Sequence, residues 1–276
     1  SGFYQTATPG TPKSTVEVRE GTLHLYGSGE AGPDLSGIAG VDTVTVTVND
    51  AKIGLFGDNS TFTLGGAATL SLGGTHLIQA GGDITFGDGA TIVADRDVDT
   101  GLRLVSTTSA VTALGGLAID VAQAGTTLTL DTVFAEGVAG TGKIVKTGDG
   151  CLKFAQQDAA PALTAFSRTE GCLVADQAQT FKELNTSKGT NLDVGTNALT
   201  MDKGSLAGSV KAGDFTKETA GTLDIAGKME LSGTFRVDGG AVGVNISQYS
   251  PAITADQAIF AAGTSPKVTG YTGTGG

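Results

Sequence analysis

The sequence predicts an all-β fold in which short parallel strands coil into a stacked β-solenoid. Three observations predict it. Glycine occupies 44 of the 276 positions, apolar and polar residues alternate over short segments, and one glycine-led segment recurs. Glycine tolerates the positive φ angles of tight corners, and an alternation of period two turns one side of each strand inward. A chain of corners and short strands with little helical periodicity therefore favours a solenoid.

Alternating segments begin near residue 15 and recur along most of the chain. Strands are predicted after a glycine at 21–25, 150–154, 171–174 and 221–225, and elsewhere at 15–18, 44–48, 61–64, 69–72, 83–86, 102–104, 117–121, 128–130, 143–145, 192–194, 199–201, 229–231, 235–237 and 242–246. Glycine pairs and Gly-Asp-Gly turns separate many of them, which is typical of strand–turn–strand chains. The spacing also suits a β-sandwich, which remains the alternative fold. Single helical turns are expected at 161–166 and 255–258.

The chain divides into three parts. Residues 1–14, with Pro9 and Pro12, are predicted to form an extended leader. Residues 15–264 carry the alternation and are expected to form one elongated solenoid domain. Residues 265–276 are predicted to be a flexible or partner-binding tail.

The charge balance excludes two classes of partner. The chain has 28 acidic and 17 basic residues, a net charge of −11, and no run of basic residues. Nucleic acids and anionic membrane surfaces bind through clustered Lys and Arg, so neither is an expected partner. No apolar stretch approaches the roughly 20 residues that a membrane-spanning helix needs.

The most specific motif lies at residues 140–174. Its first part reads GTGKIVKTGDGCLKF over 140–154, and TEGCLV follows at 169–174. This stretch resembles the passenger-associated transport repeat of bacterial autotransporters, which reads Gly-x-Gly-x-Leu-x-Lys-x-Gly-x-Gly-Thr-Leu-x-Leu and, after a loop, Gly-Thr-Leu-x-Val. Ile144 stands in place of a leucine, and Cys151 and Cys172 replace the threonine after each glycine.

The resemblance implies an exported protein. It implies passage across a Gram-negative envelope and a right-handed parallel β-helix displayed outside the cell or at the outer-membrane surface. Contact with the membrane would run only through a barrel that is not part of this sequence, so the chain would correspond to passenger sequence.

Cys151 and Cys172 occupy equivalent positions 21 residues apart, each within Gly-Cys-Leu. If one coil has that length, they lie on adjacent strands about 4.8 Å apart, within the Cα separation of about 4.4–6.8 Å that a disulfide accepts. The sequence leaves two states open, a structural disulfide and two stacked reduced thiols. The oxidising compartment that export implies favours the disulfide.

Asp95, Asp97 and Asp99 form the only candidate metal site. Alternating carboxylates start the calcium loop of EF-hand proteins, but Thr100 stands where that loop needs glycine and Ser106 where it needs glutamate. We therefore expect a solvated loop with an internal Asp–Arg pair, and no cofactor.

These features predict a non-enzymatic, secreted or cell-surface solenoid that acts as a stalk, an adhesin or surface-coat material. Its expected partner is a ligand on a host or neighbouring cell, or a second copy joined end to end. One alternative is a self-assembling extracellular filament or layer subunit. Another is a polysaccharide-acting β-helix enzyme, which would need carboxylates and basic residues gathered on one side; only 95–103 concentrates both signs.

Overall fold

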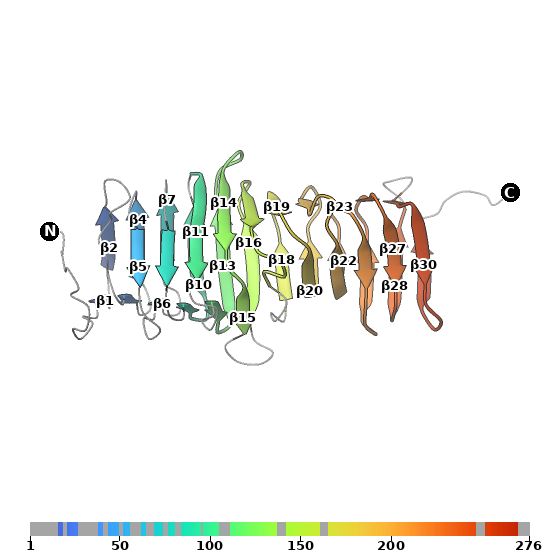
Figure 1. Cartoon of the computed structure of the whole chain (residues 1–276), viewed down its shortest axis with the longest axis horizontal. Helices are drawn as coiled ribbons and strands as arrows, with labels where there is room; N and C mark the ends of the chain where they lie inside the picture. Colours follow the sequence, from blue (N-terminus) through green and yellow to red (C-terminus); the bar gives the residue numbers. More distant parts are fainter. Residues whose placement is uncertain are drawn as a thin grey trace.

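The structure, a computed structural model, is an elongated stack of short parallel strands (Figure 1). It describes strand segments between residues 16 and 80, residues 84–94 and 96–104, and then residues 111–136, 142–160, 165–246 and 252–269. The strands stack along the long axis of the molecule, with β2 (Gly21–Tyr26) near one end and β30 (Gln257–Phe260) near the other. The predicted all-β parallel solenoid is confirmed.

The strands of the described residues fall into three sheets whose pairings are parallel. The six-stranded sheet contains β1 (Val16–Val18), β3 (Ile38–Gly40), β6 (Phe62–Leu64), β9 (Ile84–Phe86), β12 (Val111–Ala113) and β15 (Phe134–Glu136). The ten-stranded sheet contains β5 (Lys52–Leu55), β8 (Leu77–Ala80), β11 (Val98–Leu104), β14 (Thr127–Asp131), β17 (Cys151–Phe154), β19 (Cys172–Ala175), β21 (Asn191–Asp193), β23 (Ser209–Ala212), β26 (Met229–Leu231) and β29 (Ile253–Thr254).

The third sheet has 15 strands. Besides β2 and β30 it contains β4 (Val44–Asn49), β7 (Thr69–Gly73), β10 (Ala90–Ala94), β13 (Gly116–Val121), β16 (Lys143–Thr147), β18 (Ala165–Arg168), β20 (Gln179–Thr186), β22 (Leu199–Leu206), β24 (Phe215–Lys217), β25 (Thr222–Ile225), β27 (Thr234–Val237), β28 (Ala241–Asn245) and β31 (Ser265–Thr269).

The large sheet bends and so supplies two sides of the later coils. The first half of β22 pairs with β24 and its second half pairs with β25. Gly204 starts that second half with a φ of 140°, and a Cβ there would overlap the carbonyl oxygen of Leu184 on β20. Because only glycine fits this conformation and this approach, the long strand turns a corner without interrupting the stack. We call the side formed by the ten-stranded sheet the third face.

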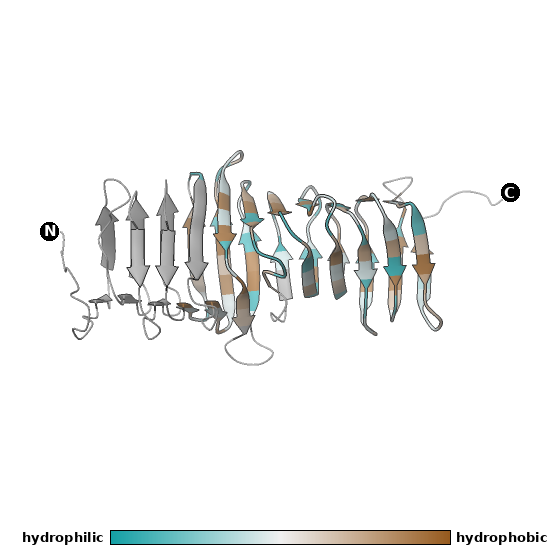
Figure 2. Ribbon diagram, in the orientation of Figure 1, coloured by the Kyte–Doolittle hydropathy of each residue, from teal (hydrophilic) through white to brown (hydrophobic). Residues whose placement is uncertain are grey.

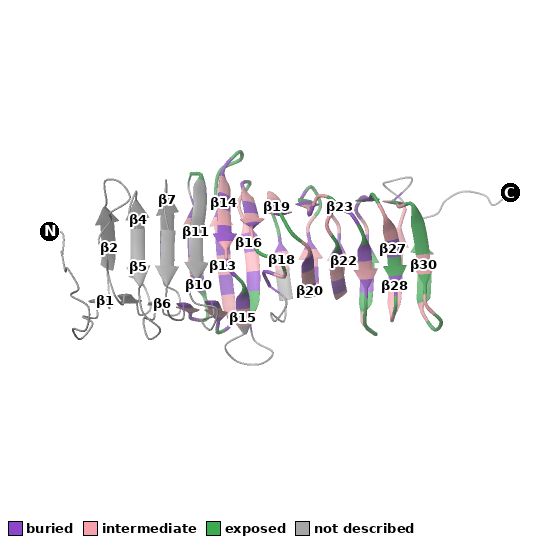
Figure 3. Ribbon diagram, viewed as in Figure 1, coloured by how far each residue is buried: buried purple, intermediate pink, exposed green. Residues whose placement is uncertain are grey.

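The core is a continuous column of apolar side chains inside the coils. In β13, Leu117, Ile119 and Val121 point inward and are at most 1% exposed, while the residues between them are half-buried. Ile119 lies in register with Ile92 of the preceding coil. The same banding of apolar and polar residues, and of buried and exposed ones, is visible along the described strands (Figures 2 and 3).

The C-terminal part of the described chain differs from the prediction in two ways. The solenoid extends beyond residue 264, because Ser265–Thr269 forms β31 and pairs with Ala241–Asn245. The flexible tail predicted from residue 265 is therefore wrong for these positions, and its partner-binding alternative stays a prediction. Pro266 obscured the strand, but a proline is tolerated on a strand with one neighbour. The helical turn expected at 255–258 is also wrong, since β30 begins at Gln257. The leader at 1–14 lies outside the described residues.

Candidate functional site

The motif at 140–174 forms one corner on two successive coils. On the first coil, residues 148–150 connect β16 to β17; on the next, residues 169–171 connect β18 to β19. The strands on both sides of the corner pair in register, Lys146 with Arg168 and Cys151 with Cys172. We call residues 146–151 and 168–172 the bridged corner.

The two cysteines lie side by side on the third face. Their Cα atoms are 4.5 Å apart and their Sγ atoms are joined in a disulfide. Both residues are half-buried, whereas Leu152 and Leu173, which follow them, are buried. The two cysteines therefore lie on adjacent strands, as predicted. The disulfide lies on the outer side of the solenoid.

Lys146 points into the solenoid and is fully buried. Its Nζ donates to the carbonyl oxygens of Gly148 and Gly150, the latter at 2.6 Å, and to that of Glu170 on the next coil at 3.3 Å. One side chain thus ties the two corners together. Its inward direction could have been read from the sequence, because Lys146 follows the apolar Ile144 by two residues on one strand.

Arg168 is the second buried cation and lies directly over Lys146. Its Nη2 donates to the carbonyl oxygen of Gly171 at 2.9 Å, and its Nη1 donates to that of Asn191 on the following coil. Its Nε is buried and has no hydrogen-bond partner. The bridged corner therefore holds two stacked cations whose hydrogen bonds reach three successive coils.

Burial lowers the pKa of both cations. Desolvation is the largest cause for Lys146, and the charge of Arg168 adds to it, so its pKa falls from 10.5 to about 8. The charges of Asp120, Glu170 and Asp149 act in the opposite direction. Desolvation likewise lowers the pKa of Arg168 to about 9. Buried charges without a paired carboxylate are costly, so other interactions must offset the desolvation of these two cations at this step of the stack.

Gly171 explains why the corner needs glycine. Its φ is +67°, and a Cβ would overlap the carbonyl oxygen of Gly150 and lie 2.6 Å from Lys146 Nζ. Glu170 adds a contact between the coils, because its Oε2 accepts a hydrogen bond from Gly148 N at 3.0 Å. Glycine spacing in the motif thus creates the space that the buried lysine fills.

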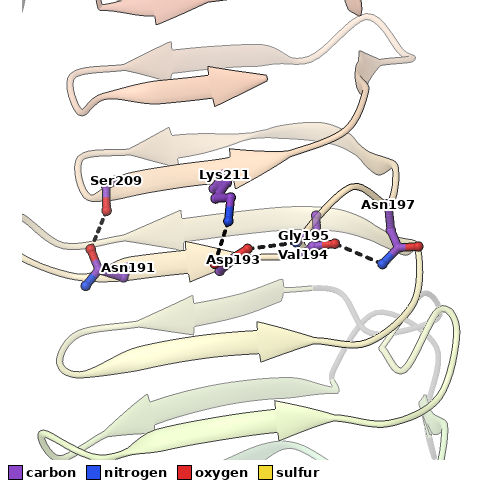
Figure 4. Close-up of polar contacts among 7 residues, drawn as sticks. All are labelled: Asn191, Asp193, Val194, Gly195, Asn197, Ser209 and Lys211. Carbon is purple, nitrogen blue, oxygen red and sulfur yellow. Dashed lines mark hydrogen bonds and ion pairs between the residues drawn. The ribbon is translucent and has the colours of Figure 1, made fainter. Parts of the chain in front are cut away.

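Polar contacts continue along the third face beyond the disulfide (Figure 4). Asn191 lies in register with Cys172, and Ser209 lies in register with Asn191 and donates to its side chain. Asp193 and Lys211 form an ion pair at 3.5 Å between the same two coils. The outer surface of this face is therefore a ladder of side chains that contact each other from coil to coil.

The predicted aspartate site is described only in part. Asp97 is exposed, and its Oδ1 accepts a hydrogen bond from the backbone N of Thr127 at 2.8 Å. Asp95 lies outside the described residues, and the side chain of Asp99 is not described. Within the described part of the chain, no three His, Cys, Asp or Glu side chains are placed to share a metal ion. The calcium-loop pattern stays untested.

The function of this chain has to be inferred from its fold and from the bridged corner. No protein-family model, curated protein or solved structure matches this chain. No helix among the described residues has the length and hydrophobicity of a membrane span. By its fold the protein is a parallel β-solenoid, and its resemblance to autotransporter passengers depends on the motif at 140–174.

Gly171→Ala tests the geometry of the bridged corner. A left-handed backbone alone costs an alanine about 1–2 kcal/mol. Gly189 has a similar φ of +84°, and no atom lies within 4 Å of the position that a Cβ would take, so Gly189→Ala is the matched control. We expect Gly171→Ala to reduce the free energy of unfolding clearly more than the control, because it also displaces Lys146. Urea unfolding followed by circular dichroism measures both, and equal losses would contradict the described corner.

Proposed function

We propose that this chain is a non-enzymatic passenger of the autotransporter type, exported across a Gram-negative envelope and acting at the cell surface as a stalk, an adhesin or coat material. The observation that carries the proposal is the Cys151–Cys172 disulfide between two coils of a continuous solenoid. Structural disulfides persist in oxidising compartments outside the cytosol. The motif that contains both cysteines is the one that resembles the transport repeat.

The outer surface supports a mechanical or adhesive role. On the third face, neighbouring coils contact each other through ion pairs such as Lys153–Asp176 at 2.8 Å and Lys211–Asp193 at 3.5 Å. Each exposed pair contributes little stability. They show, however, that polar side chains of successive coils lie next to each other on this face, and we propose that a ligand binds along it. A binding surface of this kind needs no pocket.

Antibody labelling of the producing bacterium tests the location. We expect antibodies raised against the purified chain to label intact cells, while antibodies against a cytosolic protein label only permeabilised cells. Excess purified chain should reduce adhesion of the bacterium to its target cells if the role is adhesive, and should leave adhesion unchanged if the chain is a stalk or a coat. Labelling that requires permeabilisation would contradict the proposed location.

Cleavage of an acidic polysaccharide that is lost in Asp97→Ala would contradict the non-enzymatic role.

End-to-end assembly is the second candidate function. In the last coil, Phe260 is 45% exposed and Val268 is 60% exposed. Phe260 contacts the buried Phe235 with ring centroids 6.1 Å apart, so it continues the core toward the end of the stack. Among the described strands, β30 and β31 have a neighbour on one side only. Unpaired strand edges beside apolar side chains favour the addition of further strands.

Sedimentation velocity over a range of concentrations tests this candidate. We expect the wild-type chain to form larger species as concentration rises, and Phe260→Asp to remain a monomer, because a charge at the end of the core opposes stacking. Leu114→Asp is the matched control, since Leu114 is a similarly exposed apolar residue at 39% within the body of the rod. A wild-type chain that stays monomeric at every concentration would contradict end-to-end assembly, as would equal effects of the two substitutions.

A further inference from the structure

The disulfide and the two buried cations belong to the same step of the stack. Lys146 of β16 lies in register with Arg168 of β18, and Cys151 of β17 lies in register with Cys172 of β19. The first pair points inward and the second pair outward, on the two sides of one corner. Adjacent parallel strands are about 4.8 Å apart, so the cations are close neighbours in an apolar interior.

The steps before and after this one carry no such charge pair. Lys146 lies over Ile119, and Arg168 lies under Thr186. Farther along the same column the inward residues are apolar, as at Leu206. Lys217 is also fully buried, but it is aligned with Met201 and Val237. Among the side chains that the structure describes, two aligned inward cations therefore occur at the step between the coils of β16–β17 and β18–β19.

Carboxylates in the surroundings oppose this repulsion. The charged groups that face Lys146 are Arg168 on the next coil, Asp120 of β13, Asp149 in its own corner and Glu170 in the next corner. The Glu170 carboxylate also accepts a hydrogen bond from the Gly148 backbone. The hydrogen bonds of both cations go to backbone carbonyls, and Arg168 Nε has no partner. Carbonyl oxygens satisfy donors but carry no net charge.

The disulfide lies on the outer side of the solenoid. Cys151 and Cys172 are half-buried on the outer side of the third face, whereas the cations are sealed inside. Reduction by a dithiol breaks the Sγ–Sγ bond, places one proton on each sulfur and converts the dithiol to its cyclic disulfide. A change on the surface can therefore remove the covalent link that holds the charged step closed.

We infer that the Cys151–Cys172 disulfide is a redox clamp on the charged step, and that its reduction opens the solenoid locally between β16–β17 and β18–β19. The oxidised rod is closed along its length. The reduced rod exchanges between closed and locally open forms, and the opening is driven by the Lys146–Arg168 repulsion rather than by the loss of a crosslink alone. This inference does not depend on where the protein resides.

Hydrogen exchange measured by mass spectrometry, with and without dithiothreitol, tests the clamp. The informative amides are those whose hydrogen bonds join the two coils: Cys172 N donates to Gly150 O at 3.3 Å, and Thr169 N donates to Lys146 O at 3.0 Å. In the wild-type chain at pH 7 we expect reduction to speed exchange in peptides spanning 143–154 and 165–175 by about tenfold or more, because local opening exposes these amides to solvent. Exchange in peptides from β24 to β28 should not change.

The substitution Lys146→Met distinguishes two causes of faster exchange after reduction, the repulsion between the cations and the loss of the crosslink itself. The variant has the same disulfide and keeps an unbranched side chain over Ile119, but it lacks the inward charge and the hydrogen bonds that Lys146 Nζ donates to the carbonyl oxygens of the two corners. The quantity compared is the ratio of reduced to oxidised exchange rates within each variant, so a general change in stability cancels. We expect this ratio to stay near one in Lys146→Met. An equal ratio in the two proteins would overturn the inference, as would a wild-type chain whose exchange does not change on reduction.

A second test needs no substitution. Because burial and Arg168 lower the pKa of Lys146 to about 8, the side chain is largely neutral at pH 9.5 and the repulsion is weakened. After correction for the intrinsic exchange rate, the effect of reduction on the wild-type chain should be smaller at pH 9.5 than at pH 7. An effect that is equal or larger at pH 9.5 would contradict the role of the charge pair.

Discussion

The register between successive coils is the constraint on which the rest of the structure depends. Each coil buries its apolar side chains only if they lie over those of its neighbours, as Ile119 lies over Ile92. Because a one-residue shift would turn every inward side chain outward, hydrogen bonding and core packing select the same alignment. Stability in such a stack is a sum of contacts between neighbouring coils, so each step can have its own strength.

The bridged corner shows how one step can differ from the others. Lys146 and Arg168 place two charges inside a largely apolar core, and their hydrogen bonds to corner carbonyls recover only part of the cost of burial. Gly171 leaves room for the ammonium, and the disulfide joins the same two coils from outside. Glycine, buried cation and cysteine thus form one structural unit on two successive coils.

Sequence patterns predicted the strands whose alternation is uninterrupted, such as β26 at Met229–Leu231. They missed β20, because two successive residues at its bend, Lys182 and Glu183, both point away from the core and break the period of two. They also missed the inward cations. A hydropathy pattern assigns Lys146 to the outside, and only its position two residues after Ile144 indicates the inside. The cysteine pair was predictable because its spacing equals one coil.

Engineered cysteine pairs on the third face test the register most directly. Asp193 and Lys211 are aligned on adjacent coils, and Glu230 is aligned with Lys211 one coil farther on. We expect Asp193→Cys with Lys211→Cys to form a second disulfide, detected as a crosslinked peptide by mass spectrometry, because the Cα atoms of aligned residues on adjacent strands lie about 4.8 Å apart. Asp193→Cys with Glu230→Cys should not crosslink, because two coils exceed the reach of a disulfide. Crosslinking of the distant pair without the adjacent pair would contradict the described register.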